Sequence, residues 1–365
     1  MRRNRYRRMS TCACCWALLF FAYLPLVVRA DEITLQLNLA SGQVEGTPLA
    51  WSSKQVFLLR RDGAMLDFSP NDVKTYQQTS PRFTSYTSSE MRWQLSREFG
   101  NGFDVTGTGH FLVVHPKGQR NEWAPRFEQL YRSFAHYFSV RGLNPSPPKF
   151  PLVAVVFEKR DDFFRQAAKE GSRISSNVLG YYSPQTNRIL LYDQTSSNSS
   201  DWSSNAETLI HEATHQSAFN CGIHDRFSPP PRWLAEGLGT MFEAKGVWNS
   251  RRYTRQADRI NYGRLRDFNK YVSTRREQGA LAQLISSDRF FQSDAYGAYA
   301  EAWALTFYLV ETQPRRYARY LKLTASRPHF TEYRAPDRVK DFTDIFGSNL
   351  AKIENRMLEY IGKLK

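Results

Sequence analysis

The chain has 365 residues, and its 50 Lys and Arg residues outnumber 35 Asp and Glu residues, which gives a formal net charge of +15. The positive charges are spread along the chain, and no basic run is interleaved with aromatic residues, so the sequence argues against nucleic-acid binding. Aromatic residues make up 14% of the sequence, and a chain of this length can bury a large core without disulfide support.

Residues 1–30 have the pattern of an export signal. Five Arg residues precede an apolar stretch from Cys12 to Val28, and Val28-Arg29-Ala30 resembles an A-x-A cleavage site. An uncleaved membrane anchor is the alternative, because the apolar stretch has about 18 residues. Pro25 and the small residue Ala30 favour cleavage before Asp31. The sequence therefore predicts an exported protein, periplasmic or extracellular, with no stable membrane insertion after cleavage.

Cleavage would change both the charge and the cysteine content. Residues 1–30 contain six Arg and no acidic residue, so 44 basic residues would remain against 35 acidic ones, a net charge of +9. They also contain three of the four Cys residues, which leaves Cys221 alone and excludes an internal disulfide. We expect Cys221 to be a small buried apolar side chain.

Residues 31–75 are predicted to form a small β domain. Ile33–Leu37 alternates in polarity, Gln55–Leu59 is a second strand, and turns are marked at Ser41-Gly42 and Asp62-Gly63. This pattern suits a small β-barrel or β-sandwich, with an SH3-like barrel as one form, and favours a structural or anchoring module. A linker rich in Thr, Ser and Pro is expected over residues 76–90.

A larger domain with strands and helices is expected to begin at residue 91. His110–His115 and Leu152–Phe157 are predicted strands, and the second is apolar throughout, as expected when both faces of a sheet are covered. Between them, aromatic residues recur at helical spacing from Trp123 to Phe138. A turn over residues 180–188 leads into a further strand, Ile189–Tyr192.

The next helix carries the motif His211-Glu212-Ala213-Thr214-His215. Residues four apart lie on one helix face, so His211 and His215 can direct their imidazoles at one metal ion while Glu212 projects beside it. This H-E-x-x-H arrangement supplies two zinc ligands and a general base from a single helical turn. Ser204 or Asn205 can cap the helix.

The third ligand distinguishes the classes of zinc peptidase. A metzincin would have Gly and His where this chain has Ala218 and Cys221, so that class is excluded. Glu236 follows His215 after 20 intervening residues, in the first turns of a helix that Pro231 opens, and it is the predicted ligand. His, His and Glu with a water molecule form the open tetrahedral site of a catalytic zinc.

Two other carboxylates after His215 are candidates for the third ligand. Asp225 lies in a predicted loop, where secondary structure does not fix its position. Glu243 shares a helix face with Glu236 but lies about 10 Å further along the axis. We therefore expect Glu243 to contact a ligand histidine through its second ring nitrogen rather than the metal.

The remaining chain is predicted to be helical. Residues 251–276 are rich in Arg and are interpreted as a solvated helix face. A long helix carries Tyr296, Tyr299 and Trp303, and a C-terminal helical segment is expected over residues 336–365.

The two metal-binding segments, His211–His215 and Trp-Leu-Ala-Glu-Gly at 233–237, resemble those of the gluzincin superfamily, the thermolysin-like or peptidase MA-like zinc metallopeptidases. More closely, the chain is similar to a group of secreted bacterial proteins in that superfamily whose domain has no known function. The resemblance extends from about Glu98 to Gly347, although only the two metal-binding segments are specific. The chain departs from the superfamily pattern in a slightly longer ligand spacing and in the lack of a G-x-M-E-N segment.

The resemblance implies an α+β fold in which a zincin-like catalytic domain, residues 91–335, combines a mixed sheet, the metal helix and a helical C-terminal part, preceded by the small all-β domain. It implies one Zn²⁺ per chain and hydrolysis of peptide bonds. It also implies that the strand before the metal helix edges the substrate cleft and could pair with a peptide, with an ordinary hairpin as the alternative. A Tyr or His is expected to stabilise the oxyanion. Tyr299 is the first candidate for that role, Tyr296 the second and His224 the third.

The sequence thus predicts an exported zinc peptidase that acts on a peptide or protein substrate through Glu212 and Tyr299. One alternative is a non-catalytic exported binding or scaffold protein on the same fold, against which the intact Glu212 argues. The other is a cell-envelope anchoring protein that works through its N-terminal β domain. The substrate, the choice between endopeptidase and exopeptidase, and the oligomeric state stay open.

Overall fold

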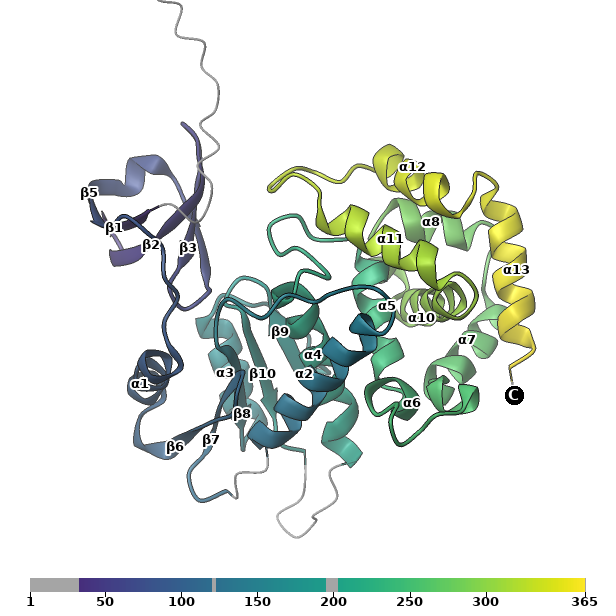
Figure 1. The fold of residues 1–365 in the computed structure, drawn as a ribbon, viewed down its shortest axis with the longest axis horizontal. Coiled ribbons are helices and arrows are strands. Elements are labelled where there is room, and N and C mark those ends of the chain that lie inside the picture. The colour runs from purple at the N-terminus through teal and green to yellow at the C-terminus, as the bar shows by residue number, and fades with distance from the viewer. Residues whose placement is uncertain (1–32, 120–122, 195–202, 365) are drawn as a thin grey trace, which may run out of the picture.

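The computed structural model describes residues 33–119, 123–194 and 203–364. Two five-stranded β-sheets are followed by a mostly helical half (Figure 1), so the expected α+β architecture is confirmed. The export signal predicted over residues 1–30 lies outside the described residues. None of the described helices is long and apolar enough to span a membrane.

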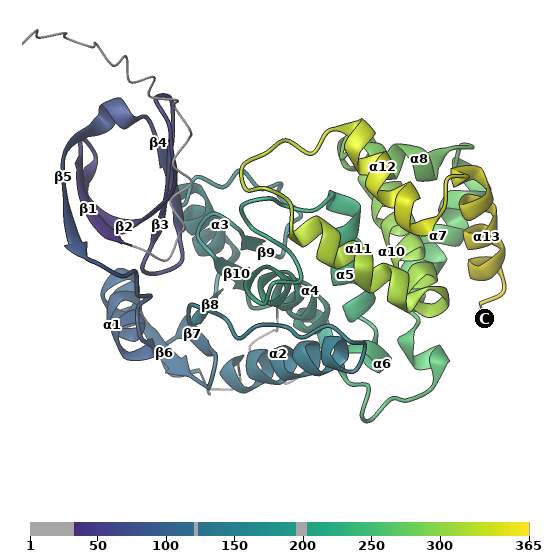
Figure 2. The same ribbon diagram turned by 45° about the horizontal axis from the view of Figure 1, so that its top comes forward.

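The first sheet is antiparallel and has the strand order β4-β3-β2-β1-β5. Its core is small and contains Leu35, Leu37 and Leu58, around which the sheet curls (Figure 2). The strands are β1 (Thr34–Leu39), β2 (Gly42–Trp51), β3 (Val56–Arg60), β4 (Met65–Phe68) and β5 (Val73–Ser80).

Strand β5 corrects the prediction of a linker over residues 76–90. Residues 76–80 belong to the sheet, where β5 pairs with β1. The strand was missed because nearly all of its side chains are exposed, so no alternation of apolar and polar residues marks it. Helix α1 (Ser88–Phe99) then begins within the same expected linker, with Thr87 and Glu90 forming a capping box.

The second sheet is mixed and has the order β6-β7-β8-β10-β9. Strands β7, β8 and β10 run parallel, while β6 and β9 are antiparallel strands at the two edges. Their bounds are Phe103–Gly107 for β6, Phe111–Pro116 for β7, Leu152–Phe157 for β8, Gly180–Ser183 for β9 and Arg188–Tyr192 for β10.

Both faces of the second sheet are covered, as the continuous apolar run in β8 predicts. Leu152, Ala154 and Val156 pack into the large core, which includes residues of helices α2 (Trp123–Ser139) and α4 (Ser203–Asn220). Val153 and Val155 pack on the other face with residues of α1 and α3 (Arg160–Lys169). One side of α4 therefore packs against the second sheet.

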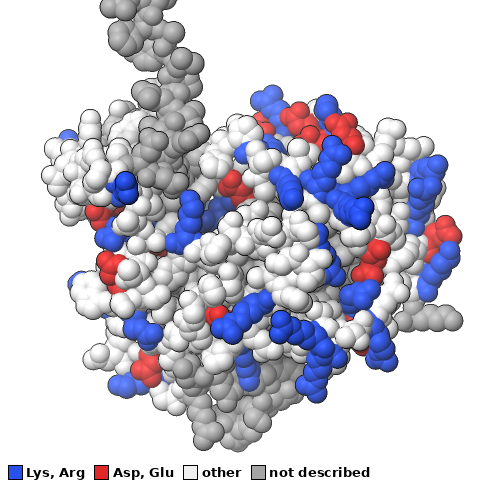
Figure 3. All heavy atoms as spheres, viewed as in Figure 1, with Lys and Arg blue, Asp and Glu red and all other residues white. Residues whose placement is uncertain are grey.

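The helical half packs against α4 and supplies the other wall of the site. Its elements are α5 (Arg232–Phe242), α6 (Lys245–Trp248), α7 (Tyr262–Thr274), α8 (Ala280–Ser286), α9 (Phe290–Ser293), α10 (Ala295–Thr312), α11 (Pro314–Ala325), α12 (Ala335–Phe346) and α13 (Leu350–Gly362). On the face drawn in Figure 3, Lys and Arg side chains lie over both the sheet side and the helical side, with Asp and Glu among them.

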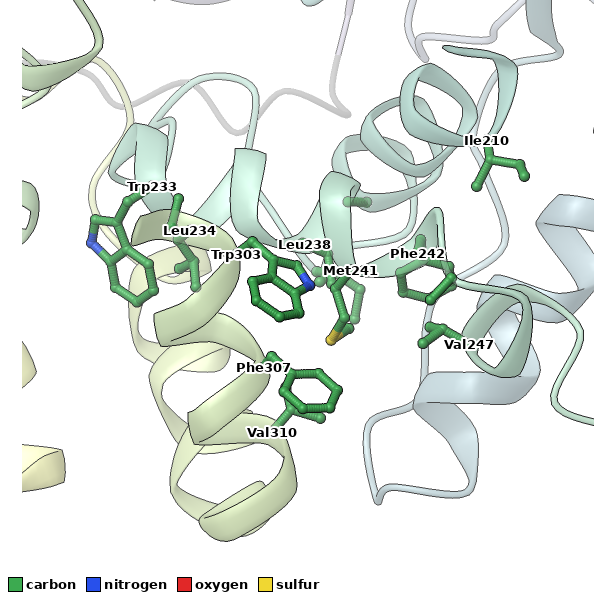
Figure 4. Close-up of a cluster of buried hydrophobic side chains, with 14 of the residues drawn as sticks. Ile210, Trp233, Leu234, Leu238, Met241, Phe242, Val247, Trp303, Phe307 and Val310 are labelled. Atoms are coloured by element: carbon green, nitrogen blue, oxygen red, sulfur yellow. The ribbon is translucent and has the colours of Figure 1, made fainter. Parts of the chain in front are cut away.

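Helix α5 lies against the long helix α10 in the centre of this half. Figure 4 shows Trp233, Leu234, Leu238 and Met241 of α5 beside Trp303 and Phe307 of α10, all of them buried. Gly237 allows the close approach, because a Cβ atom there would lie 2.1 Å from Thr306 Oγ1 and 2.6 Å from the carbonyl oxygen of Ala302. The opposite face of α5, which carries Glu236, is left to face α4.

The first sheet is joined to the rest of the protein through a second apolar cluster. The ring of Phe57 in β3 stacks on Phe330 at a centroid distance of 4.0 Å and an interplanar angle of 12°. Phe330 has a positive φ of 59°, and its N–H donates to the carbonyl of Phe227 over 2.7 Å. The segment that follows, residues 331–333, helps to line the cleft described below.

Candidate metal centre

Helices α4 and α5 bring three predicted ligands together. His211 and His215 lie one turn apart on α4, and Glu236 faces them from α5. The Nε2 atoms of the two histidines are 3.0 Å apart, and Glu236 Oε2 lies 3.2 Å from His211 Nε2 and 3.3 Å from His215 Nε2. In the part of the chain that the structure describes, this is the one group of His, Cys, Asp and Glu residues whose ligand atoms cluster closely enough for a metal ion.

These separations fit a tetrahedral zinc site. Zinc binds nitrogen and oxygen at about 2.0–2.2 Å, so two ligand atoms in a tetrahedral site stand about 3.3 Å apart. The three observed separations of 3.0, 3.2 and 3.3 Å form such a triangle. Burial by itself would raise the pKa of Glu236, but hydrogen bonds with His211 and His215 hold this pKa well below its usual value. The carboxylate is therefore negatively charged and suited to a cation.

Glu243 contacts His211 from the side opposite the ligand cluster. Its Oε1 lies 2.8 Å from His211 Nδ1, and its Oε2 accepts a hydrogen bond of 2.7 Å from Asn261 Nδ2. Because a carboxylate accepts hydrogen bonds, the proton of the neutral ring is assigned to Nδ1, which leaves the Nε2 lone pair for a metal. Glu243 is absent from the ligand cluster and lies where the sequence predicts it.

Gly239 on α5 is required by the close approach of the His211 ring. A Cβ atom at this position would lie 2.7 Å from His211 Cε1 and 2.9 Å from His211 Nε2. Any larger side chain would push the imidazole away from its neighbours. Gly239 therefore allows the His211 ring to lie close to α5 and to Glu236.

Glu212 stands beside the ligand cluster without belonging to it. Its Oε2 accepts a hydrogen bond of 2.7 Å from the backbone N–H of Tyr182, in the edge strand β9. Burial raises the pKa of Glu212, and the neighbouring His211 and His215 oppose that rise. A carboxylate held in this position can exchange a proton with a molecule bound at the cluster.

The cluster opens into a cleft of about 630 Å³. One side is formed by β9 and its neighbours, including Gly180, Tyr181 and Tyr182, and the other by Arg232, Tyr299 and the segment before α12. Tyr299 thus lies in the same cleft as His211, Glu212, His215 and Glu236. Burial raises the pKa of Tyr299 above its usual value, and the nearby Glu236 raises it further, so its phenol is a neutral hydrogen-bond donor.

Three other residues that the sequence offered as oxyanion donors or metal ligands lie outside the cleft or the ligand cluster. The Tyr296 hydroxyl donates to Asp267 over 2.9 Å, and Tyr296 lines a separate hollow next to the cleft. His224 is 1% exposed, does not line the cleft, and has its pKa lowered to about 3 by burial. Asp225 pairs with His329 over 2.8 Å and is not in the ligand cluster. Cys221 is a buried free thiol.

The expectation that β10 edges the cleft is wrong. Strand β10 lies between β8 and β9, and the edge strand is β9. The turn between β9 and β10 is fixed to the metal helix through Asn187, which has a positive φ of 59° that Asn tolerates well. Its backbone oxygen accepts from Gln216, and its side chain bonds to Asn220, both on α4.

Several residues of the site were not singled out from the sequence. Arg232, one turn before Glu236, donates from Nε to Glu236 Oε1 over 3.3 Å. Asn261 holds Glu243, and the backbone of Tyr182 holds Glu212. Of these residues, only Arg232 could have been found from the sequence, because its i,i+4 spacing to Glu236 favours an ion pair.

Asn205, predicted as a possible helix cap, lies inside α4. Its side chain bonds to Asp193 and accepts from the N–H of Gln194.

The family model described as "Protein of unknown function (DUF1570)" matches residues 205–331, the stretch that contains α4 and α5. No protein with a curated description matches the sequence.

Among solved structures, the M1 zinc metallopeptidase from Deinococcus radiodurans is 12% identical over 70% of this chain and 50% of its own, with a TM-score of 0.41. A mutant of that enzyme bound to a Tyr-Ser-Ala substrate is also 12% identical, over 72% and 51%, with a TM-score of 0.40. Yeast LTA4 hydrolase in complex with bestatin is 13% identical over 70% and 37%, with a TM-score of 0.41. The chain spans about half the length of the Deinococcus enzyme.

Proposed function

We propose that this protein is an exported zinc-dependent peptidase of the gluzincin type. The observation that carries the proposal is the triangle of His211, His215 and Glu236 ligand atoms, with the carboxylate of Glu212 beside it in an open cleft. A purely structural zinc site is closed by four protein ligands and needs no base. Three ligands and a neighbouring carboxylate favour catalysis over the scaffold alternative.

His211, His215 and Glu236 would hold the zinc, and Glu243 would keep the His211 ring in the tautomer that binds it. Zinc at this position would supply a Lewis acid that acidifies a water molecule and polarises a peptide carbonyl. Glu212 accepts the proton of the attacking water and delivers it to the leaving amine. The N–H of Tyr182 would hold this carboxylate beside the ligand cluster.

Tyr299 is the proposed donor to the oxyanion. It lies in the cleft with the ligand cluster, and its raised pKa keeps the phenolic proton in place at neutral pH. A preorganised donor of this kind acts on charge that develops only in the transition state. The substrate is a peptide or protein, and export by residues 1–30 is part of the proposal.

A peptide-library digest would test the function. The purified protein is loaded with zinc and compared with Glu212→Gln under the same conditions. We expect the wild type to cleave peptides and the variant to have lost the activity, with one zinc in each. Cleavage that is equal in the two proteins, or a wild type that binds no zinc after reconstitution, would contradict the proposal.

The anchoring alternative predicts a different result. An anchor that works only through residues 33–80 would bind the cell envelope whether or not the metal ligands are present. The contacts of Phe57 with Phe330 join that sheet to the wall of the cleft, which favours a supporting role in the peptidase. Comparing wild type with His211→Ala in an envelope-binding assay separates the two functions.

A further inference from the structure

The two carboxylate oxygens of Glu236 have different partners. Oε2 lies 3.2 Å and 3.3 Å from the Nε2 atoms of His211 and His215. Oε1 accepts a hydrogen bond of 3.3 Å from Nε of Arg232, the first residue of α5. One oxygen is therefore directed at the metal position and the other is held by a cation.

Arg232 is itself held from several sides. Its backbone N–H donates to Asp288 Oδ1 over 3.0 Å, and the same Asp288 forms a forked pair with Arg338 at 2.8 Å and 3.0 Å. The guanidinium lies 4.7 Å from the centroid of the Phe291 ring. The charge of Arg232 also opposes the rise in the pKa of Tyr299. Arg232 thus has a fixed place in the cleft wall, unlike a freely moving surface arginine.

A second Arg–Glu pair in this protein has the same spacing and lies outside the candidate metal site. Arg132 donates from Nε to Glu128 Oε1 over 3.0 Å, again at i,i+4 spacing. Arg132 has 73% of its side chain exposed, against 43% for Arg232. Glu128 is not in the ligand cluster, so this pair provides a matched control without a metal.

We propose that Arg232 is a positioning residue that holds Glu236 as a one-oxygen ligand. A carboxylate free to rotate can bind a metal through both oxygens, which would raise the coordination number from four to five. By occupying Oε1, Arg232 keeps the site four-coordinate, with three protein ligand atoms and one position for water or substrate. This inference rests on the proposed metal site and goes beyond it, because it assigns a role to a residue outside the ligand set.

Cobalt substitution tests the role without relying on activity. Co²⁺ with four ligands absorbs visible light more strongly than Co²⁺ with five. The proteins to compare are wild type, Arg232→Leu, Arg232→Lys and the control Arg132→Leu, each loaded with Co²⁺ alone. Leu keeps an apolar stem over Phe291 and removes the guanidinium, and Lys restores a cation that can reach Oε1.

We expect a loss of visible absorption in Arg232→Leu, with the wild-type spectrum retained in Arg232→Lys and in Arg132→Leu. An unchanged spectrum in Arg232→Leu, or an equal loss in Arg132→Leu, overturns the inference. If Arg232→Leu does not fold, a five-coordinate spectrum in Arg232→Met, which also lacks a donor, supports the inference and a four-coordinate one overturns it. A wild type that binds cobalt but cleaves no peptide overturns the peptidase proposal alone, and one that binds no cobalt overturns both.

Discussion

The backbone N–H of Tyr182 donates to Oε2 of Glu212 over 2.7 Å, so the edge strand of the second sheet is fastened to the proposed general base. Replacing Glu212 by Gln keeps an oxygen that can accept this bond and removes the ability to carry a proton. We therefore expect Glu212→Gln to retain zinc and its unfolding temperature but to lose peptidase activity by about a hundredfold or more. Zinc content, thermal unfolding and turnover of one peptide substrate check this; undiminished turnover would place the chemistry elsewhere.

The three carboxylates after His215 should differ sharply in their effect on zinc affinity. Glu236→Ala removes an atom of the ligand triangle and should abolish tight binding. Glu243→Ala removes the partner of His211 Nδ1 and should weaken binding about 10–100-fold. Asp225→Ala, which removes the contacts with His329 and with the backbone N–H of Phe227, serves as the control. Competition with a chromogenic chelator measures all three, and loss of zinc in Asp225→Ala alone would refute the ligand assignment.

Gly239→Ala should damage the metal site without touching a ligand. The added methyl group would lie 2.7 Å from His211 Cε1, so the ring must move away from Glu243 and His215. We expect zinc affinity to fall at least about tenfold, on the scale of losing a partner of a ligand histidine.

The control for this substitution is Gly362→Ala, also in a helix, where no heavy atom lies within 4 Å of the added methyl group. That change should leave zinc affinity unaltered and stabilise the fold by up to about 1 kcal/mol through helix propensity. Chelator competition and thermal unfolding separate the two effects. Equal zinc affinity in both variants would show that α5 can shift to accommodate the methyl group.

The pair of His329 and Asp225 should make stability depend on pH. The hydrogen bond with Asp225 raises the pKa of His329 above 6.5, so the folded state binds this proton more tightly than the unfolded chain. The stabilisation is complete below pH 6.5 and is lost as the pH rises through the raised pKa of the folded state.

The effect is expected to be small, because 47% of the His329 side chain is exposed. Urea unfolding of wild type and His329→Gln from pH 5.5 to 9 would measure it as a difference between the two proteins, which removes the contribution of other titrating groups. A difference that grows with pH would contradict the assigned direction.

Much of the metal centre follows from sequence because helical spacing is a local property. A spacing of four positions between His211 and His215 places both on one face of any α-helix, whatever surrounds it. The choice of Glu236 needed one further step, the recognition of a helix opened by Pro231. The position of Glu243 outside the ligand cluster could be predicted by the same reasoning, because it follows Glu236 by seven positions and each helical position adds a fixed rise along the axis.

Strand order and non-local partners could not be derived in this way. Strand β9 lies at the sheet edge because β10 pairs with β8, a contact between segments far apart in the chain. Asn261 reaches Glu243 from another helix, and nothing in the local pattern around residue 261 points there. Strand β5 was missed for a different reason. Its side chains are polar and exposed, so they do not indicate a strand, and the strand is held by backbone pairing with β1.

The stacking of Phe57 on Phe330 has a consequence for the order in which the chain folds. The first sheet can pair its own strands as soon as they are made, but its outer apolar face has to wait for a partner near the other end of the sequence. Closing so long a loop is slow, and an uncovered aromatic face is prone to aggregation meanwhile. The period between synthesis of the first sheet and synthesis of Phe330 would therefore be the vulnerable one, and a chaperone that shields residues 49–59 should raise the yield.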